Sequence, residues 1–235
     1  MKKTLTVGDL HGKDVWRQAL GRLDEFDYLI IHCDLLDSFT ITRKQQLQNL
    51  KDIIYAKKQN PDKIKLILGN HDNCYIFYQT QYQDATQCSG FSSNFAGDVR
   101  QLYYHNIECF QSAFQIGNTL WTHAGMCQWI WDHIFCPEYK DKDMSVADFI
   151  NKLYIENTGL LLHVGKRRGG ACQHGNIFWE DLRDLTEDLL KGYNQIVGHT
   201  HVKEIYTITN EDGNFTIFTD CLDSQTKFLE LEVEE

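Results

Sequence analysis

The sequence predicts an α/β fold, in which helices pack on a β-sheet, and three observations support this. Apolar runs typical of buried strands occur at Leu5–Val7, Tyr28–His32 and Ile64–Leu68. Two segments with helical periodicity, 13–25 and 43–58, separate these runs. Turn-linked strands follow in the second half of the chain. Strands that alternate with helices in this order are typical of a sheet covered by helices.

Each of the two predicted helices has one apolar face. In the first helix, Val15, Ala19 and Leu23 share a face at helical spacing. The second helix is amphipathic, and Pro61 follows it as a stop signal. We expect its inward-facing side chains to be Leu47, Leu50, Ile54 and Tyr55.

The segment 73–100 is polar and aromatic without a clear period, which indicates a long loop or an irregular helical insert. After it, Phe110–Ile116 and Thr119–Thr122 read as a β-hairpin around Gly117-Asn118. Ser145 is placed to cap a helix over 146–156. The remaining strands are expected at Gln195–Val197, at 202–209 and 214–220 around Asp212-Gly213, and at Phe228–Val233.

The length and composition favour one globular domain over residues 1–235. Only two prolines occur, and no Gly/Ser tract reads as a linker. The chain is 42% hydrophobic and 24% charged, as ordinary soluble domains are. Its formal net charge of −10 disfavours nucleic acid as a partner, because surfaces that bind nucleic acid are usually basic.

The N-terminal stretch predicts a cytoplasmic protein without a membrane partner. Asp9 and His11 interrupt it, so it lacks the apolar core of a signal peptide, and the chain has no run of eighteen apolar residues. None of the eight cysteines forms a CxxC pair, and in a reducing compartment we expect free thiols, many of them buried. The oligomeric state is not predicted.

Five apolar runs end in polar side chains of the kind that bind metals. The runs lead into Asp9, Asp34, Asn70, His123 and His199. In open α/β sheets, ligands bind beyond the carboxyl ends of the strands, so these residues are expected to form one site. Individually, such an Asp is usually a turn former and such a His a structural residue. Their recurrence at five strand ends favours a common site.

The residue types fit a pair of metal ions. Asp, His and Asn supply oxygen and nitrogen donors without a thiolate, which favours manganese, with iron, zinc or nickel as alternatives. Asp9 and His11 lie two residues apart, so an extended tip presents them on the same side.

The ordered motifs GDLHG, DLLD, GNHD, HAG and GHTH resemble those of the calcineurin-like metallophosphoesterases. The likeness runs from Asp9 to His201. Within the superfamily, the chain looks most similar to small phosphoprotein-phosphatase-type enzymes of bacteria and phages, and to symmetrical dinucleoside tetraphosphatases. The resemblance implies a four-layer α-β-β-α sandwich of two mixed sheets, with a dinuclear metal site at the strand C-terminal ends.

The resemblance also implies a role for each motif residue. The implied ligands of the first metal are Asp9, His11 and Asp34, and those of the second are Asp34, Asn70, His123 and His199. His201 matches a further ligand that many phosphatase-like members lack. His71 matches the histidine that assists leaving-group departure, and Asp37 matches the carboxylate that orients it. The alternative for Asp37 is a helix cap.

The second motif departs from the phosphatase pattern. It reads CDLLDSF where the family usually has GDxVDRG, so the arginine that grips the substrate phosphate is missing. The basic, glycine-rich segment 165–184 offers replacements in Arg183 or Arg168, and less so in Arg167. A solvated basic loop is the alternative reading of this segment.

The predicted function is hydrolysis of phosphomonoesters, including phosphoserine or phosphothreonine in proteins, by in-line attack of a metal-activated water. The expected substrates are phosphorylated small molecules, nucleotides or phosphoproteins. The alternatives are cleavage of dinucleoside tetraphosphates, aided by aromatic side chains between Tyr75 and Phe95, a nuclease, or a non-catalytic scaffold with the same fold.

Overall fold

The computed structural model describes residues 1–140 and 143–235. Its strands form two five-stranded mixed sheets, with the orders β10-β1-β2-β3-β4 and β5-β6-β7-β9-β8. The strands of the first sheet are β1 Lys2–Val7, β2 Tyr28–His32, β3 Ile64–Ile67, β4 Phe110–Gln111 and β10 Leu229–Val233. Those of the second are β5 Ala113–Ile116, β6 Thr119–Thr122, β7 Asn194–Val197, β8 Tyr206–Thr209 and β9 Phe215–Phe218.

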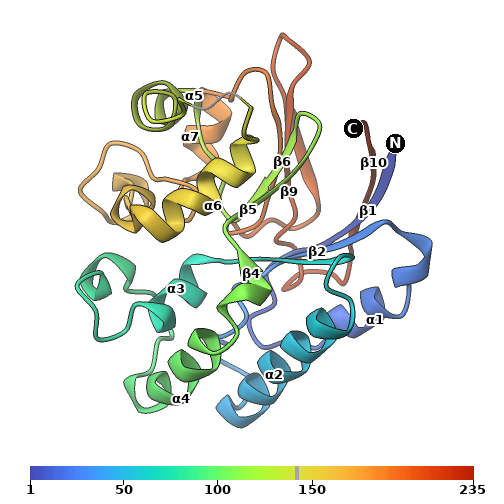
Figure 1. The fold of residues 1–235 in the computed structure, drawn as a ribbon, viewed down its shortest axis with the longest axis vertical. Helices are drawn as coiled ribbons and strands as arrows, with labels where there is room; N and C mark the ends of the chain where they lie inside the picture. The colour runs from blue at the N-terminus through green and yellow to red at the C-terminus, as the bar shows by residue number, and fades with distance from the viewer. Residues whose placement is uncertain (141–142) are drawn as a thin grey trace.

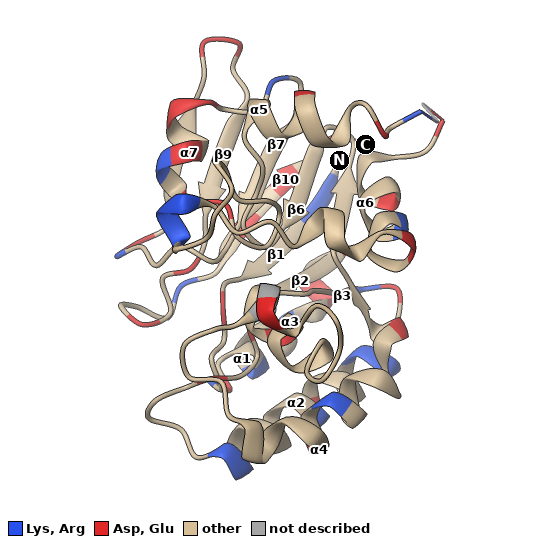
Figure 2. Ribbon diagram, turned by 90° about the vertical axis from the view of Figure 1, so that its left-hand side faces the viewer, with Lys and Arg blue, Asp and Glu red and all other residues tan. Residues whose placement is uncertain are grey.

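Helices cover the outer faces of both sheets (Figure 1). Beside the first sheet lie α1 Trp16–Leu20, α2 Arg43–Gln59, α3 Asn70–Ile76 and α4 Ser93–Tyr104. Beside the second lie α5 Gln128–Ile130, α6 Val146–Glu156 and α7 Leu182–Glu187. The two groups of helices lie at opposite ends of the molecule, with the sheets between them (Figure 2). The four-layer arrangement implied by the resemblance is therefore confirmed.

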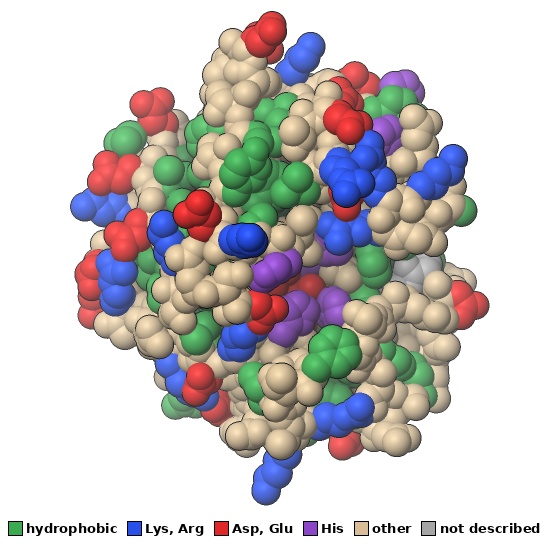
Figure 3. All heavy atoms as spheres, turned by 180° about the vertical axis from the view of Figure 1, so that it is seen from behind, with side chains coloured by type: hydrophobic (Ala, Val, Ile, Leu, Met, Phe, Trp, Pro, Cys, Tyr) green, Lys and Arg blue, Asp and Glu red, His purple; other side chains and the backbone are tan. Residues whose placement is uncertain are grey.

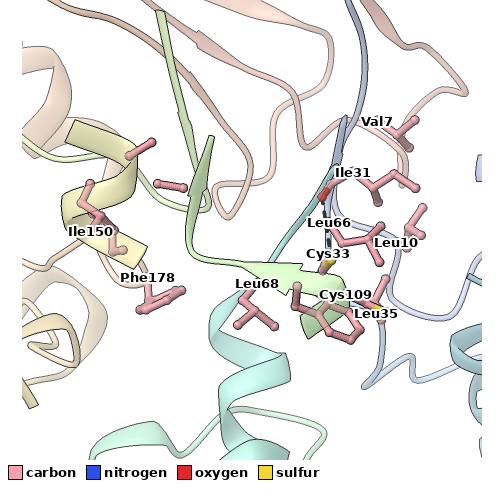
Figure 4. Packing of buried hydrophobic residues seen from close by; sticks show 14 of the residues in the cluster. Val7, Leu10, Ile31, Cys33, Leu35, Leu66, Leu68, Cys109, Ile150 and Phe178 are labelled. Carbon is pink, nitrogen blue, oxygen red and sulfur yellow. Dashed lines mark hydrogen bonds between the residues drawn. The ribbon is translucent and has the colours of Figure 1, made fainter. Parts of the chain in front are cut away.

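The two sheets pack face to face because alternate strand residues point to opposite sides. On β2, Ile30 faces the second sheet, where it joins the cluster of Trp121 and Ile196. Its neighbour Ile31 belongs instead to the cluster under the helices, together with Leu66 and the other side chains drawn in Figure 4. The indole Nε1 of Trp121 donates to Thr6 Oγ1 at 3.1 Å, which links the sheets.

Two expectations from the sequence need correction. Tyr55 does not face inward, because 67% of it is exposed. The buried stripe of α2 runs through Leu50, Ile53 and Ile54, and Tyr55 lies about 140° around the helix from Leu50.

The run 110–116 is also not one strand, contrary to the prediction from the sequence. It divides at Ser112 into β4 of the first sheet and β5 of the second, and Ser112 N donates to Asn151 Oδ1 at 2.8 Å.

Several local predictions are confirmed. Ser145 caps α6 by accepting a hydrogen bond from Asp148 N at 3.0 Å.

The helix expected over 13–25 is shorter than predicted. Gly21 N donates to Arg17 O at the end of α1, and a short 3₁₀ turn follows. The segment 73–100 contains the end of α3, a 3₁₀ turn and the start of α4, so it is the helical insert rather than the loop. No helix in the described parts of the chain has the length and apolarity that a bilayer crossing requires.

Candidate metal centre

The five polar strand ends meet at the junction of the two sheets. Asp9, Asp34 and Asn70 follow the parallel strands β1, β2 and β3, while His123 and His199 follow β6 and β7. All except His199 are at most 2% exposed. Figure 3 shows histidine side chains gathered around carboxylates in a hollow of this face. The structure thus brings together residues that lie up to 190 positions apart in the chain.

One group of four donor atoms joins both sheets. Asn70 Oδ1 lies 2.8 Å from His123 Nε2 and 2.9 Å from His199 Nδ1. His123 Nε2 lies 3.2 Å from His199 Nδ1 and 3.3 Å from Asp34 Oδ2. Two ligands about 2.1 Å from one ion and at right angles are about 3 Å apart, so this spacing fits four ligands of one transition metal.

A second group also contains Asp34, together with His11 and His71, and its donor atoms lie within 4.8 Å of one another. His11 Nε2 is 4.0 Å from Asp34 Oδ2, and His11 Nδ1 donates to Leu36 O at 2.9 Å, which leaves Nε2 as the ring's free acceptor. Asp9 Oδ2 accepts from His199 N at 2.7 Å, while its buried Oδ1 has no hydrogen-bond partner. Because Asp34 belongs to both candidate ligand clusters, its carboxylate is placed to bridge two ions.

The backbone at these strand ends is strained. Five non-glycine residues in the described chain have positive φ, and four of them are His11 (42°), Asp34 (36°), Asp37 (68°) and His199 (62°). Such conformations cost roughly 1–3 kcal/mol each and concentrate at functional sites. The backbone strain therefore indicates a functional site at these residues, independently of their metal-binding side chains.

The charges of the cluster are strongly coupled. Burial alone would raise the pKa of Asp34, but His123, His71 and His11 together hold it well below its usual value. Burial raises the pKa of Asp9, and the neighbouring Asp220 and Asp34 raise it further. A bound cation would relieve this repulsion between buried carboxylates, so the electrostatics also fit a metal centre.

His71 lies at the rim of the cluster and is held by Asp37. His71 Nδ1 is 2.8 Å from Asp37 Oδ2, and the hydroxyl of the buried Tyr75 donates to Asp37 Oδ1. Although burial lowers it, the pKa of His71 is raised to about 9 by Asp34 and Asp37. Both carboxylates therefore favour the protonated ring, which lies beside the donor atoms.

The structure places the three predicted arginines differently. Arg168 donates through Nη2 to Thr200 Oγ1, next to His199, and its Nε lies 3.0 Å from Asp181 Oδ2. The side chain of Arg183 is exposed on the first turn of α7. Arg167 is engaged away from the cluster, with Asp184 at 2.9 Å and Glu187 at 2.8 Å. Arg168 is therefore the arginine that the fold brings to the site.

His201 lies outside both ligand clusters. Its side chain is exposed, and Nε2 is 3.4 Å from Ser224 Oγ. Asp220 is instead a buried carboxylate beside the centre: it lies two residues after β9 and raises the pKa of Asp9. Asp220 was missed from the sequence, although the run TIFTD repeats the signal of a strand that ends in aspartate.

Asp72 was also missed, and it organises the loops around the centre. Its carboxylate accepts from the backbone N–H groups of Asp34 at 2.9 Å, Leu35 at 3.0 Å and Gly69 at 2.8 Å. The hydroxyl of Tyr103 donates to the same carboxylate at 2.5 Å. Asp72 thereby ties the tip of β2 to the tip of β3. It belongs to the GNHD motif, which is the signal that could have identified it.

Comparisons with known proteins agree with this geometry. The model of the calcineurin-like phosphoesterase family matches residues 2–203. A search of curated proteins finds no match. Among solved structures, a cold-active protein-tyrosine phosphatase of a psychrophilic Shewanella species is 15% identical with a TM-score of 0.59, and the match covers 99% of this chain and 76% of that one. Another structure of a cold-active protein tyrosine phosphatase is 16% identical with a TM-score of 0.63, covering 99% and 74%.

At these identities the likeness to solved structures shows the shared fold alone. The family match covers most of the chain, including the five strand ends. The chain therefore belongs to the calcineurin-like phosphoesterase family, whose members hydrolyse phosphoester bonds with divalent metal ions.

Proposed function

We propose that this protein hydrolyses phosphomonoesters at a dinuclear metal centre formed by the five strand ends. The observation that carries the proposal is the position of Asn70 Oδ1, which lies within 2.9 Å of ring nitrogens from both His123 and His199. An amide oxygen and two imidazoles from two sheets, together with a shared carboxylate, form a ligand set for a transition metal.

We assign the proposed ligands from their contacts and from their places in the family's motifs. The first metal would be held by Asp9, His11 and Asp34, and the second by Asp34, Asn70, His123 and His199. His71 also has a donor atom within 4.8 Å of those of His11 and Asp34, and we assign it to the reaction rather than to the metal. The Oδ1 of Asp9, which has no hydrogen-bond partner, and the spacing of the four donor atoms of Asp34, Asn70, His123 and His199 support this fit. When bound, two such ions acidify a water and stabilise charge on the phosphate oxygens. The nitrogen and oxygen donors suit manganese, iron, zinc or nickel, and we propose manganese. We leave His201 out of the set because it is exposed.

His71 is the proposed general acid. An alkoxide leaves phosphorus slowly unless its oxygen is protonated, and the imidazolium of His71 would donate that proton. The 2.8 Å hydrogen bond to Asp37 occupies Nδ1, so Nε2 is the nitrogen that would face the substrate. Tyr75 in turn holds Asp37 in place.

Arg168 is the proposed phosphate-binding cation, in place of the arginine missing from the second motif. Its charge acts on the site, since Arg168 helps to lower the pKa of His199, after burial and His123. Thr200 and Asp181 orient the guanidinium from two sides. A planar guanidinium held this way suits bidentate binding of phosphate oxygens.

Cleavage of dinucleoside tetraphosphates is the less favoured candidate. It would benefit from aromatic side chains that stack on bases. Tyr75 is only 1% exposed and packs on Phe91 and Phe95, with ring centroids 5.0 and 5.9 Å apart. These rings therefore stabilise the insert. Phosphate leaving groups also depend less on a general acid such as His71.

A substrate panel tests the proposal. The purified protein, loaded with Mn²⁺, is assayed with p-nitrophenyl phosphate, bis-p-nitrophenyl phosphate, diadenosine tetraphosphate, and phosphoserine and phosphotyrosine peptides. We expect the highest kcat/KM on a monoester, and no turnover in Asp34→Asn, because that change removes charge from the shared ligand. A higher kcat/KM on diadenosine tetraphosphate would contradict the monoester assignment. Turnover unchanged in Asp34→Asn would contradict the proposed centre.

A further inference from the structure

A second group of metal-binding side chains lies apart from the proposed catalytic centre. Donor atoms of Cys127, His174 and Glu180 all lie within 4.8 Å of one another. We call these three residues the Cys127 cluster. Cys127 is the residue before α5, and it follows His123 by four positions. His174 and Glu180 come from the segment 165–184.

The Cys127 cluster is buried and incompletely hydrogen-bonded. Cys127 and Glu180 are both 0% exposed. Glu180 Oε1 accepts from the backbone N–H groups of Gly175 at 3.2 Å and Asp181 at 3.1 Å. The Cys127 thiol interacts with the Glu180 carboxyl, whose Oε2 has no nitrogen or oxygen donor beside it. The buried Nδ1 of His174 has no hydrogen-bond partner. Buried polar atoms in native proteins are usually paired, so these two atoms and the thiol beside them are available for contact with a ligand.

Glu180 has no neutralising cation among the described residues. The two nearby arginines are engaged elsewhere, Arg167 with Asp184 and Arg168 with Asp181. Burial, and to a lesser degree Asp184, raise the pKa of Glu180 to about 7. Burial and the neighbouring Glu180 likewise raise the pKa of the Cys127 thiol. A carboxylate at 0% exposure is costly unless it is protonated or bound to a cation.

We propose that Cys127, His174 and Glu180 bind a zinc ion at a site separate from the dinuclear centre. A thiolate, an imidazole and a carboxylate together are typical zinc ligands, and the sulfur disfavours magnesium and manganese. Binding would displace the thiol proton and would replace the contact between the Cys127 thiol and the Glu180 carboxyl with two bonds to the metal. Asp184 is a further oxygen donor beside His174: its Oδ1 lies 3.7 Å from His174 Nδ1, and its Oδ2 has no hydrogen-bond partner.

Such an ion would brace the segment that reaches the catalytic centre. Trp179, the neighbour of Glu180, packs edge-on against His199 with ring centroids 5.8 Å apart. The same segment carries Arg168, which is bonded to Thr200. Ala124 N also donates to Ile177 O at 2.7 Å, so the segment is joined to the loop after β6. Zinc in the Cys127 cluster would therefore stabilise the fold and the position of Arg168.

Cobalt substitution tests the proposal independently of activity. Co²⁺ is titrated into tag-free, metal-stripped full-length protein under anaerobic conditions, and the near-ultraviolet sulfur-to-cobalt charge-transfer band is recorded. We expect one cobalt–thiolate site per chain, bleached when Zn²⁺ is added. The proposed dinuclear centre has no sulfur ligand, so cobalt bound there gives no such band. The band should disappear in Cys127→Ser. In Glu180→Gln, the apparent affinity for Co²⁺ read from this band should fall at least tenfold.

Two matched thiols serve as controls. Cys172 lies in the same segment, and Cys88 Sγ lies 3.2 Å from Asn70 Nδ2 beside the catalytic centre. Cys172→Ser and Cys88→Ser should both keep the band. A wild-type protein without the band, or a band that survives in Cys127→Ser, would overturn the proposal. If Cys127→Ser does not fold, His174→Ala decides, because it changes a partly exposed ligand: unchanged cobalt affinity there would also overturn it.

Discussion

Gly69, at the tip of β3, provides a steric test of the metal centre. A Cβ atom at this position would lie 2.0 Å from Asp34 Oδ1 and 2.9 Å from His123 Cε1. The backbone itself would accept alanine, since φ is −105° and ψ is 177°. The substitution Gly69→Ala therefore acts on the proposed bridging carboxylate through crowding, with little backbone strain.

The size of the expected effect follows from these distances. Ordinary contacts begin at 3.4 Å, so the Asp34 carboxylate must move by roughly 1.4 Å or the β3 tip must shift by a similar amount. Displacement of about 1 Å at a catalytic group costs about 100-fold in rate. We expect Gly69→Ala to lower kcat/KM on p-nitrophenyl phosphate by at least 100-fold and to weaken the binding of Mn²⁺.

Gly97 provides the matched control for this assay. It lies on the exposed side of α4, and a Cβ there meets nothing within 4 Å. Because alanine is a better helix former by about 1 kcal/mol, Gly97→Ala should keep full activity and equal or higher thermal stability. The reasoning would be refuted if folded Gly69→Ala kept its metal and a kcat/KM within threefold of the control.

Three further predictions concern the acid and the phosphate-binding arginine. His71→Asn should keep its metal and lose about 10²–10⁴-fold in kcat on alkyl phosphates, with a smaller loss on p-nitrophenyl phosphate; equal losses on both would count against an acid role. The proposed acid is the protonated form of His71, so activity should fall at alkaline pH as this ring loses its proton. Asp37 raises the pKa of His71 through its hydrogen bond and its charge, so Asp37→Asn should move this fall to lower pH. An unmoved pH profile would argue against the pairing. Arg168→Ala should raise KM about tenfold or more, since a charge-assisted hydrogen bond contributes roughly 1.5–3 kcal/mol. Arg183→Ala is the control and should leave KM unchanged. The reverse pattern would assign phosphate binding to Arg183.

The parts of the fold that follow from local sequence pattern were predicted well. Parallel strands with polar tips are visible in the sequence because each apolar run is continuous and ends in a ligand-type residue. The ends of β1, β2, β3, β6 and β7 were all located in this way. Tyr55 was misplaced because the apolar pattern of a helix does not show where its buried stripe ends, so an apolar side chain at the edge can also face solvent.

Features that depend on long-range packing could not be predicted. The change of sheet at Ser112 is set by its contact with Asn151, which lies 39 residues away. The Cys127 cluster brings together residues about 50 positions apart without a CxxC or similar spacing. The choice among the three arginines also depends on the course of the segment 165–184, whose glycines and polar residues give no period. The single-domain organisation over 1–235 stays a prediction.

The central claim is that Asp34 bridges two metal ions at the junction of the sheets. Electron paramagnetic resonance of the Mn²⁺-loaded protein at low temperature tests it most directly, because two ions that share a ligand are exchange-coupled. We expect a coupled multiline signal in the wild-type protein, and its loss together with turnover in Asp34→Asn. Signals of isolated Mn²⁺ alone in a fully active wild-type protein would contradict the account.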